Sequence, residues 1–200
     1  AGAHSVYEAL MGRTPLSACL QSTCVKGLSL IPADIRLAGA ELELVELERR
    51  EYRLKHLLKT IEGDFDFLFV DCPPSLGLLT VNALTAAQRV LIPIQCEYYA
   101  LEGVSSLMNT VNRVKHAFNP GLDIEGVLLT MLDARTNLGI QVVDSVKKHF
   151  KSRVFATAIP RNVRLGEAPS HGLPIHLYDP RSLGADSYRR LAQEFLQRNR

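Results

Sequence analysis

Short apolar segments alternate with helix-like segments over the last two thirds of the chain. Strands are predicted for the β-rich runs "FDFLFV", "RVLIPI", "IEGVLLTM" and "RVFATAI". Helical spacing of apolar residues predicts helices between and after them, near residues 78–87, 100–117, 137–150 and 183–197. Strands separated by helices imply right-handed crossovers. The pattern therefore predicts an α/β fold with a doubly wound, mostly parallel sheet and helices on both faces.

The first third of the chain lacks this regular alternation of strands and helices. Ser5 followed three residues later by Glu8 is a capping box, and Gly12 is a stop signal, so "SVYEALMG" is predicted to be a short helix. "GLSLIPA" indicates a brief strand. From residue 34 to 62, apolar residues recur at helical spacing among many charges, which predicts one long or two shorter amphipathic helices with Gly39 as a weak point.

Composition narrows the class of protein. With 200 residues, 46% of them hydrophobic, the chain suits one globular domain, residues 1–200. Its apolar runs are shorter than the roughly 20 residues of a spanning helix, and its start has no secretory pattern, so a cytoplasmic location is expected. The cysteines fit neither a zinc knuckle nor a dense disulfide framework, so buried or incidental thiols are expected.

The charge is distributed unevenly. From Arg135 to the C-terminus there are 12 Lys and Arg against 5 Asp and Glu, whereas residues 1–134 hold 11 against 16. The balances are therefore +7 and −5. Such a split permits an anionic partner at one end, although an ordinary solvated surface explains it equally well.

Ligands of parallel sheets bind beyond the carboxyl ends of the strands, so the loops that start at Asp71, Gln95, Leu132 and Pro160 are of interest. Asp71 directly follows an apolar run, and an acid there needs a cation or hydrogen bonds. A magnesium ion bound through water is one solution. Capping of the next helix by Asp71, without a metal, is the alternative.

Five blocks of the chain carry a family resemblance. "FDFLFVDCPPSLGLLTVNAL" resembles the second acidic motif and switch loop of the ParA/Soj family of partitioning ATPases. The other blocks, in the family's order, are "IPADIRLAGAELELVELERREYRLK", "PIQCEYYALEGVSSLMNTVNRVK", "LLTMLDARTNLGIQVVDSVKKHF" and "AIPRNVRLGEAPSHGLPIHLYDPRSLGADSYRRLAQEF". The resemblance covers essentially the whole chain and implies a P-loop NTPase-like fold.

The resemblance also implies roles for individual residues. Asp71 is the expected catalytic and magnesium-linked acid. The residues of the expected switch loop are Cys72, Pro73, Pro74, Ser75 and Gly77. The residues expected around the adenine of ATP are Met131, Pro160, Arg161 and Asn162. Arg135 and Arg164 lie where the family carries residues that bind DNA without sequence preference. Met131 as plain core, and the arginines as ordinary surface cations, are the alternatives.

One defining part of the family is absent from the 200 residues. The resemblance implies a phosphate loop of the form KGGxGKT, which holds the β and γ phosphates, and the sequence contains no such segment. By the length of a βαβ unit, on the order of 50 residues precede the matching region in the family. We expect a domain without its first strand, phosphate loop and first helix. It is either a piece of a longer ATPase or a short paralogue.

The implied parent activity is that of an ATP-dependent switch. ATP and Mg²⁺ would join two subunits into a homodimer that binds DNA non-specifically on the nucleoid, and a ParB/Spo0J-like partner would stimulate hydrolysis. In this chain we expect little or no hydrolysis. The alternatives are a MinD-like membrane-associated ATPase, a metal-cluster carrier, and a nucleotide-free DNA- or partner-binding paralogue. The C-terminal "SYRRLAQEFLQRNR" resembles a MinD tail, but docking on the protein's own core is expected, without stable membrane association.

Overall fold

The computed structural model describes residues 4–72, 77–97 and 100–199. These residues form two compact units. The first unit comprises Ala1–Gln88 and Asn109–Leu122, and the second comprises Arg89–Met108 and Asp123–Arg200. Helix α5 (Ala100–Ala117) contributes its first part to the second unit and its remainder to the first.

The first unit consists mainly of short helices. Its α-helices are α1 (Val6–Leu10), α2 (Ala40–Val45), α3 (Arg53–Leu58) and α4 (Leu78–Ala86). Its 3₁₀ helices are η1 (Leu16–Cys19), η2 (Ile35–Ala38), η3 (Arg50–Tyr52) and η4 (Glu62–Asp64). The strands β1 (Gln21–Ser22) and β2 (Ser29–Leu30) form an antiparallel pair.

The capping box predicted for α1 is confirmed. The Ser5 side chain accepts a hydrogen bond at the start of the helix, and the Glu8 carboxylate accepts one from the Ser5 backbone N–H at 2.8 Å. Gly12 follows the helix with φ of +73°, a conformation that glycine adopts without a steric penalty. Hydrogen bonds from Ser5, together with the nearby Arg36 guanidinium, lower the pKa of Glu8 to about 2.

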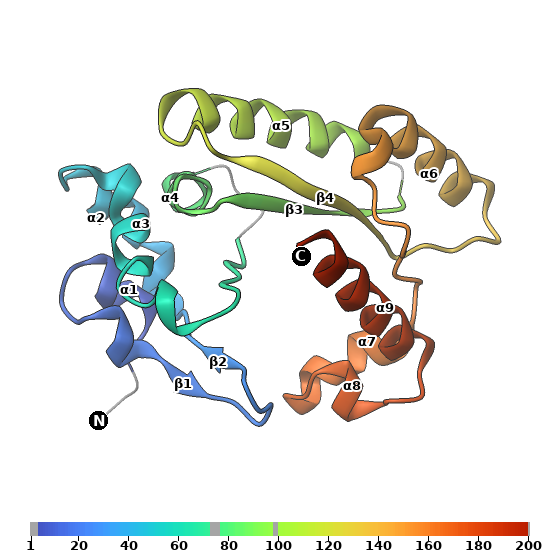
Figure 1. Ribbon diagram of the computed structural model, residues 1–200, viewed down its shortest axis with the longest axis horizontal. Coiled ribbons are helices and arrows are strands. Elements are labelled where there is room, and N and C mark those ends of the chain that lie inside the picture. The colour runs from blue at the N-terminus through green and yellow to red at the C-terminus, as the bar shows by residue number, and fades with distance from the viewer. Residues whose placement is uncertain (1–3, 73–76, 98–99, 200) are drawn as a thin grey trace. The chain divides into compact units, whose positions relative to one another are not determined.

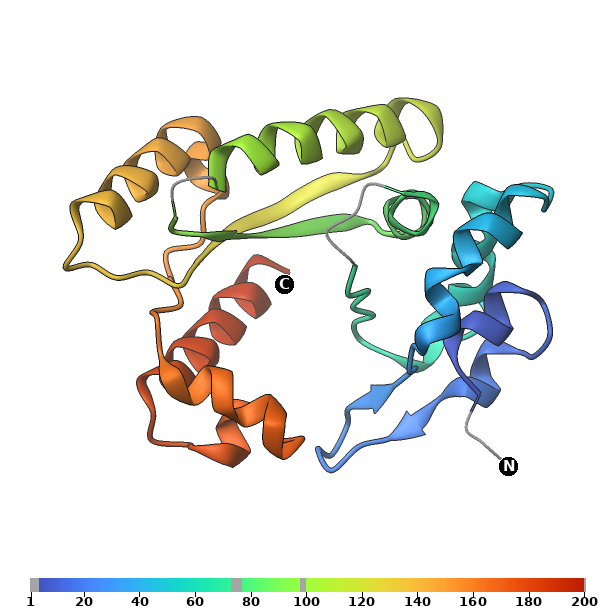
Figure 2. The ribbon, with the colours of Figure 1, turned by 180° about the vertical axis from the view of Figure 1, so that it is seen from behind.

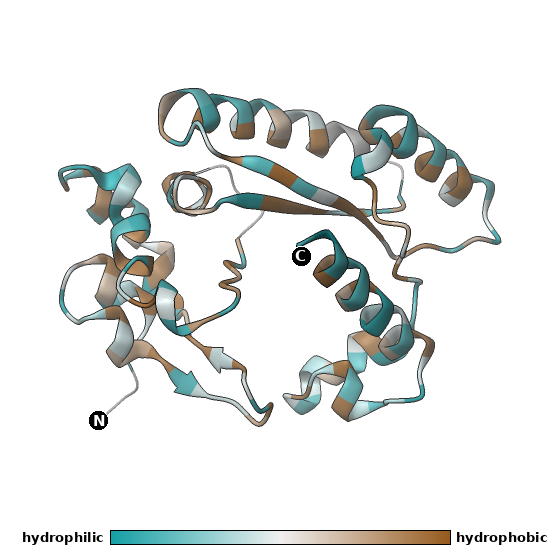
Figure 3. Cartoon of the chain, in the orientation of Figure 1, coloured by the Kyte–Doolittle hydropathy of each residue, from teal (hydrophilic) through white to brown (hydrophobic). Residues whose placement is uncertain are grey.

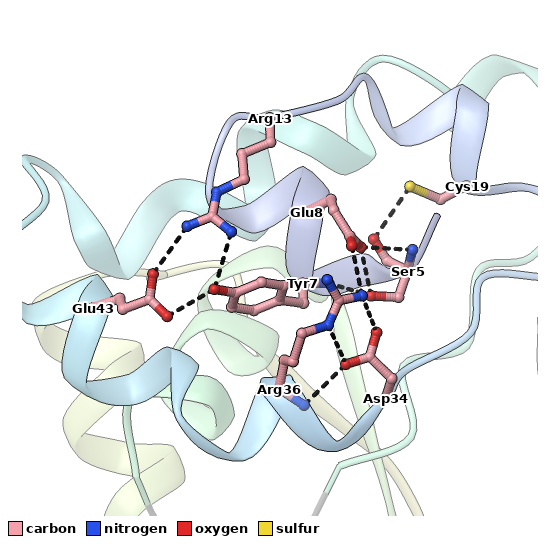
Figure 4. A network of polar contacts seen from close by, with 8 residues as sticks. All are labelled: Ser5, Tyr7, Glu8, Arg13, Cys19, Asp34, Arg36 and Glu43. Carbon is pink, nitrogen blue, oxygen red and sulfur yellow. Dashed lines mark hydrogen bonds and ion pairs between the residues drawn. The ribbon is translucent and has the colours of Figure 1, made fainter. Parts of the chain in front are cut away.

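A polar network holds α1 against η2 and α2 (Figure 4). Arg36 donates to both oxygens of Asp34 at 2.9 and 2.7 Å and also pairs with Glu8. The buried Tyr7 ring lies between the guanidinium groups of Arg13 and Arg36, each 5.1 Å from its centre. Its hydroxyl donates to Glu43 at 2.8 Å. The N-terminal helix is thus fixed by cation–π and ionic contacts in addition to apolar packing.

Helices α3 and α4 form the centre of the first unit, and Asn82 of α4 connects them. The Asn82 amide oxygen accepts from the Leu54 N–H at 3.1 Å, and its NH₂ donates to the carbonyls of Arg50 at 2.8 Å and Leu78 at 3.0 Å. The side chain is fully buried, so each of these bonds replaces one that water would otherwise supply. Asn119 similarly donates to the carbonyl of Ala87 at 2.7 Å, beyond the end of α4.

The second unit is built on two parallel strands, β3 (Arg89–Gln95) and β4 (Asp123–Thr130). Its other elements are α6 (Asn137–Phe150), η5 (Lys151–Arg153), α7 (Val163–Glu167), η6 (Ala168–His171), α8 (Ile175–Tyr178) and α9 (Leu183–Arg198). Figures 1 and 2 show α6 on one side of the two strands and α9 on the other. The predicted α/β class, with a parallel sheet and helices on both faces, is thereby confirmed.

Two apolar clusters cover the two faces of these strands. On one face, Ile92, Ile94 and Val127 pack with Val104 of α5 and Val146 of α6. On the other, a cluster joins the strands to α7 and α9: Leu91, Leu128, Phe155, Ile159, Leu165, Leu191 and Phe195. Figure 3 shows the apolar colouring of both strands beside the largely hydrophilic α9. Both faces of β4 are therefore buried, as expected of parallel strands.

Docking of the C-terminal helix on its own core is confirmed for Leu191 and Phe195. Arg198 of α9 donates to the Val154 carbonyl at 3.0 Å, and Glu194 accepts from the backbone N–H groups of Ala156 and Thr157 at 2.8 and 2.9 Å. These polar contacts fix the end of the helix to the segment beside β4. None of the helices in the described residues is long and apolar enough to cross a membrane.

Two predicted strands differ from the structure. The run "FDFLFV" forms no strand, and four of its apolar residues are exposed, Phe69 with 74% of its surface. The prediction was wrong because strands depend on a neighbouring strand, and residues 65–70 join neither ladder of the described chain. "RVFATAI" forms only isolated contacts with β4, among them a bridge between Val127 and Val154. Its backbone still pairs, since the Ile159 N–H donates to the Leu129 carbonyl at 2.8 Å.

The central role of Asn82 generates a stability prediction. Asn82→Ala removes a buried amide that satisfies one buried and two partly buried backbone groups, so it is expected to lower the free energy of unfolding by roughly 2–4 kcal/mol. Thr85→Val is the matched control on the same buried helix, because the Thr85 hydroxyl has no hydrogen-bond partner among the described residues. That control should leave stability unchanged or higher. Urea unfolding measures both, and equal midpoints for the two variants would contradict the assignment.

Candidate functional site

The loops after β4 and before α7 meet in the second unit. Leu132 bridges to Pro160, its N–H donates to the Ile159 carbonyl at 3.1 Å, and its carbonyl accepts from the Arg161 N–H at 3.0 Å. Two of the residues expected around an adenine, Pro160 and Arg161, are thus held beside the residue that follows Met131. The sequence had placed these residues at strand ends, and the backbone pairing brings the two strand ends together.

Met131 has an unusual backbone at the end of β4. Its φ is +54°, in the left-handed region that costs a non-glycine residue free energy. About a third of its surface is exposed, so Met131 is not the plain core residue of the alternative interpretation. Non-glycine residues in strained conformations cluster at functional sites, where the surrounding structure holds them.

Arg161 and Asn162 have partners within the protein. The Arg161 guanidinium donates to Glu97 at 2.7 Å. The Asn162 side-chain oxygen accepts from the Arg164 N–H at 2.9 Å, and this bond caps α7. Asn162 is therefore the N-cap residue of α7. Pro160 and Met131 provide apolar side chains.

Arg135 precedes α6 and is held by Asp133. Its Nε and one NH₂ donate to the two carboxylate oxygens at 2.9 and 2.8 Å, and its backbone N–H donates to the first of them at 3.1 Å. These hydrogen bonds lower the pKa of Asp133 to about 2. The Arg135 side chain is 89% exposed, so it faces solvent even while paired.

Arg164 lies on α7 between two carboxylates. It donates to Glu167 at 2.8 Å and lies 3.4 Å from an Asp179 oxygen. The Tyr178 hydroxyl donates to the same Glu167 at 3.1 Å. The nearby Arg164 guanidinium, followed by the Tyr178 hydroxyl, lowers the pKa of Glu167. His171, the last residue of η6, stacks on Tyr178 with ring centres 4.8 Å apart.

A second group of cations escaped the sequence analysis. Lys147, Lys148 and Lys151 are exposed at the end of α6, and none of them forms an ion pair within the part of the chain that the structure describes. The signal was present as the run "KKHFKSR", where five of seven residues can carry positive charge. Together with Arg135 at the other end of α6, these lysines account for much of the basic character of the C-terminal part.

Asp71, the expected metal-linked acid, belongs to the first unit. Asp71 and Cys72 are exposed, and Gly77 precedes α4 as its N-cap. Pro73, Pro74 and Ser75 lie outside the described residues. The N-terminus of α4 has an internal partner, because the Leu79 N–H donates to the Glu41 carboxylate of α2 at 3.1 Å. Glu41, rather than Asp71, therefore supplies the negative charge at this helix end.

Among the residues that the structure describes, no group of three or more His, Cys, Asp or Glu side chains could hold a metal ion. A magnesium ion at Asp71 would therefore need ligands from water and from a phosphate. Magnesium ions in nucleotide sites are commonly bound in this way, by one or two carboxylates and the substrate phosphates.

Comparison with known proteins identifies the family. A family model described as an AAA domain matches residues 2–124. The sporulation initiation inhibitor protein Soj of Bacillus subtilis is 59% identical over 189 residues, which cover 94% of this chain and 75% of that protein. The chain belongs to the ParA/Soj family. The chromosome partitioning protein ParA of Myxococcus xanthus is 50% identical over 195 residues, covering 98% of this chain and 69% of that protein.

Solved structures agree on the fold of this ParA/Soj family member. Cobyrinic acid a,c-diamide synthase from Mycobacterium smegmatis, with a bound ATP analogue and magnesium, is 40% identical and matches with a TM-score of 0.84. The match covers 97% of this chain and 72% of that one. The Soj and ParA relatives favour the partitioning ATPase interpretation over the MinD-like alternative.

The strained Met131 generates a prediction with an unusual sign. Met131→Gly is expected to raise the free energy of unfolding by roughly 0.5–1 kcal/mol, because glycine adopts a φ of +54° without steric cost. The neighbouring Thr130→Gly is the control. Thr130 is part of β4, so the same substitution there should destabilise by roughly 1 kcal/mol. Thermal unfolding followed by circular dichroism distinguishes the two, and a loss of stability in both variants would refute strain at Met131.

Proposed function

We propose that this chain, residues 1–200, is a ParA/Soj-type domain that acts in DNA segregation and carries the non-specific DNA-binding face, and that a form which also has a phosphate loop binds DNA in a nucleotide-dependent way. The carrying observation is its 59% identity with Soj over 94% of the chain. In the proposed function, ATP joins two copies into a homodimer on the bacterial nucleoid in the cytoplasm, and a ParB/Spo0J-like protein stimulates hydrolysis. Whether the cargo is a chromosome or a plasmid is left open by this proposal.

Arg135 and Arg164 carry the proposed DNA contacts. Guanidinium groups pair with phosphate oxygens through two parallel hydrogen bonds, and exposed arginines can reach a phosphate backbone. The Arg135 and Arg164 side chains are 89% and 54% exposed. The free lysines at the end of α6 add sequence-independent attraction. Such binding requires no reading of base edges, in agreement with non-specific contact.

The residues of the proposed nucleotide site fit an adenine and a metal in part. Met131 offers exposed apolar surface at the end of β4, and the residue after it, Leu132, bridges to Pro160. Arg161 and Asn162 would contribute through backbone groups and the remaining amide NH₂. Asp71 would hold Mg²⁺ through water, and bound ATP with Mg²⁺ would supply the hydrolysable phosphate bond. Cys72 to Gly77 would follow the nucleotide state as a switch loop.

A nucleotide-free DNA- or partner-binding protein is the second candidate function. The 200 residues contain no KGGxGKT segment, so these residues by themselves offer little to hold the phosphates of a nucleotide. Without backbone amides and a lysine to cradle the phosphates, most of the binding free energy for ATP is missing. The MinD-like alternative is disfavoured because Leu191 and Phe195 of α9 are committed to the core.

The DNA contacts can be tested on the unmodified chain. Arg135→Ala with Arg164→Ala is expected to weaken binding to a random-sequence duplex by roughly tenfold or more and to reduce the salt slope by about one for each arginine. Fluorescence anisotropy at several salt concentrations measures both quantities. Arg113→Ala removes the same charge from an exposed site in the first unit and serves as the control. Unchanged binding in the double variant would remove the proposed DNA face.

Nucleotide binding separates the two candidate functions. Titration of this chain with labelled ATP and Mg²⁺ is expected to show no binding in the micromolar range and little or no hydrolysis, since no phosphate loop is present in its sequence. Asp71→Asn is the companion variant. Micromolar binding that Asp71→Asn abolishes would show that the chain holds nucleotide without that loop, and would make the ATPase role direct.

A further inference from the structure

Both arginines of the proposed DNA face are already engaged by carboxylates of the same chain. Arg135 is paired with Asp133, and Arg164 with Glu167 and Asp179. The lysines at the end of α6 have no such partners among the described residues. The inference below rests on the proposed DNA-binding function and concerns what these acids do to it.

The contact between Arg135 and Asp133 uses the same donors that a phosphate would use. The guanidinium presents its Nε and one NH₂ to both carboxylate oxygens, at 2.9 and 2.8 Å. A phosphate bound side by side to this fork would need the same two N–H groups. Asp133 is only 24% exposed, and its oxygen also accepts the Arg135 backbone N–H, whereas the Arg135 side chain is 89% exposed apart from its contact with this carboxylate.

Arg164 is likewise an exposed arginine whose guanidinium is paired with carboxylates of the same chain. Glu167 lies on α7 and accepts a hydrogen bond from the Tyr178 hydroxyl at 3.1 Å. Asp179 directly follows α8, and its Oδ2 lies 3.4 Å from Nε of Arg164. Arg164 itself is 54% exposed. In both pairs, therefore, a carboxylate that is held by a further hydrogen bond contacts a guanidinium that is exposed to solvent.

We propose that Asp133 and Glu167 set the DNA affinity of this chain by competing with phosphate for the guanidinium groups of Arg135 and Arg164. Binding exchanges an internal carboxylate for an external phosphate at each arginine, whereas the lysines bind phosphate without exchange. Exposed ion pairs are weak, so the competition lowers affinity by at most about fivefold at each arginine. The acids thus weaken the binding of small anions, each of which must displace a carboxylate. DNA is affected less, because several cations contact it at the same time.

The test substitutes each acid by its amide. Asp133→Asn and Glu167→Gln retain an oxygen that accepts the Arg135 backbone N–H and the Tyr178 hydroxyl, so the local fold is preserved while the competing charge is removed. Asp179→Asn is added to Glu167→Gln so that the second acid cannot replace the first. Thermal unfolding verifies that the variants remain folded.

Asp144→Asn is the matched control, because it removes the same charge from an exposed acid in the middle of α6 that pairs with no cation in the described residues. Anisotropy with a random-sequence duplex is expected to show binding about two- to fivefold tighter for each acid-to-amide variant. The variant that combines Asp133→Asn with Glu167→Gln and Asp179→Asn should bind the duplex about tenfold more tightly. Asp144→Asn should change affinity by less than twofold. Gains no larger than that of Asp144→Asn, or weaker binding, would overturn the proposal.

The outcome separates this inference from the proposed function. Loss of binding in the Arg135→Ala, Arg164→Ala variant, with no gain in the amide variants, would leave the DNA face standing and reject the competition. Absence of DNA binding by the unmodified chain and by every amide variant would reject both. Gains in the amide variants that disappear when the arginines are also replaced would support both.

Discussion

Strand β4 is the element on which the second unit depends, because its backbone is hydrogen-bonded on both edges. β3 pairs along one edge, and the Phe155 and Ile159 N–H groups bond to its carbonyls on the other, at 2.9 and 2.8 Å. This second approach requires Gly126, where an added Cβ would lie 2.5 Å from the Phe155 ring. Since both edges are satisfied, the loops that begin at Met131 and Pro160 leave the sheet side by side, and the candidate site is assembled from that pairing.

Elements formed by local interactions were predictable from the sequence. The four helices expected in the later part of the chain correspond to α4, α5, α6 and α9 within one or two residues, because caps and 3.6-residue spacing act within a few positions. The amphipathic region from residue 34 to 62 resolves into short helices, with Gly39 between η2 and α2. The run "FDFLFV" failed because β-structure is completed by distant residues, and local propensity contains no information about them.

The candidate site was predictable only in part, because the sequence indicated its arginines and loop ends but not the acids that pair with them. Residue types and order pointed to the arginines and to the loop ends, and the family assignment is confirmed. The acids that accompany those arginines were not foreseen. Asp133 lies two residues from Arg135, but Asp179 reaches Arg164 across 15 positions, and Glu97 reaches Arg161 across 64. Only the fold decides which opposite charges meet. The roles of Asp71, Met131, Arg161 and Asn162 in nucleotide binding stay predictions.

The contact of Glu41 with the N-terminus of α4 links the size of residue 77 to the packing of α2 against α4. The Leu79 amide is bonded to a side chain of α2, and a Cβ added to Gly77 would lie closer to the Glu41 carboxylate than any real contact allows. The small size of Gly77 therefore leaves room for the Glu41 carboxylate at this helix end. A larger side chain at position 77 would require the Glu41 carboxylate to move, and its hydrogen bond with the Leu79 N–H would then have to rearrange. The first turn of α4 and the position of the Glu41 side chain on α2 are thus linked through a single hydrogen bond.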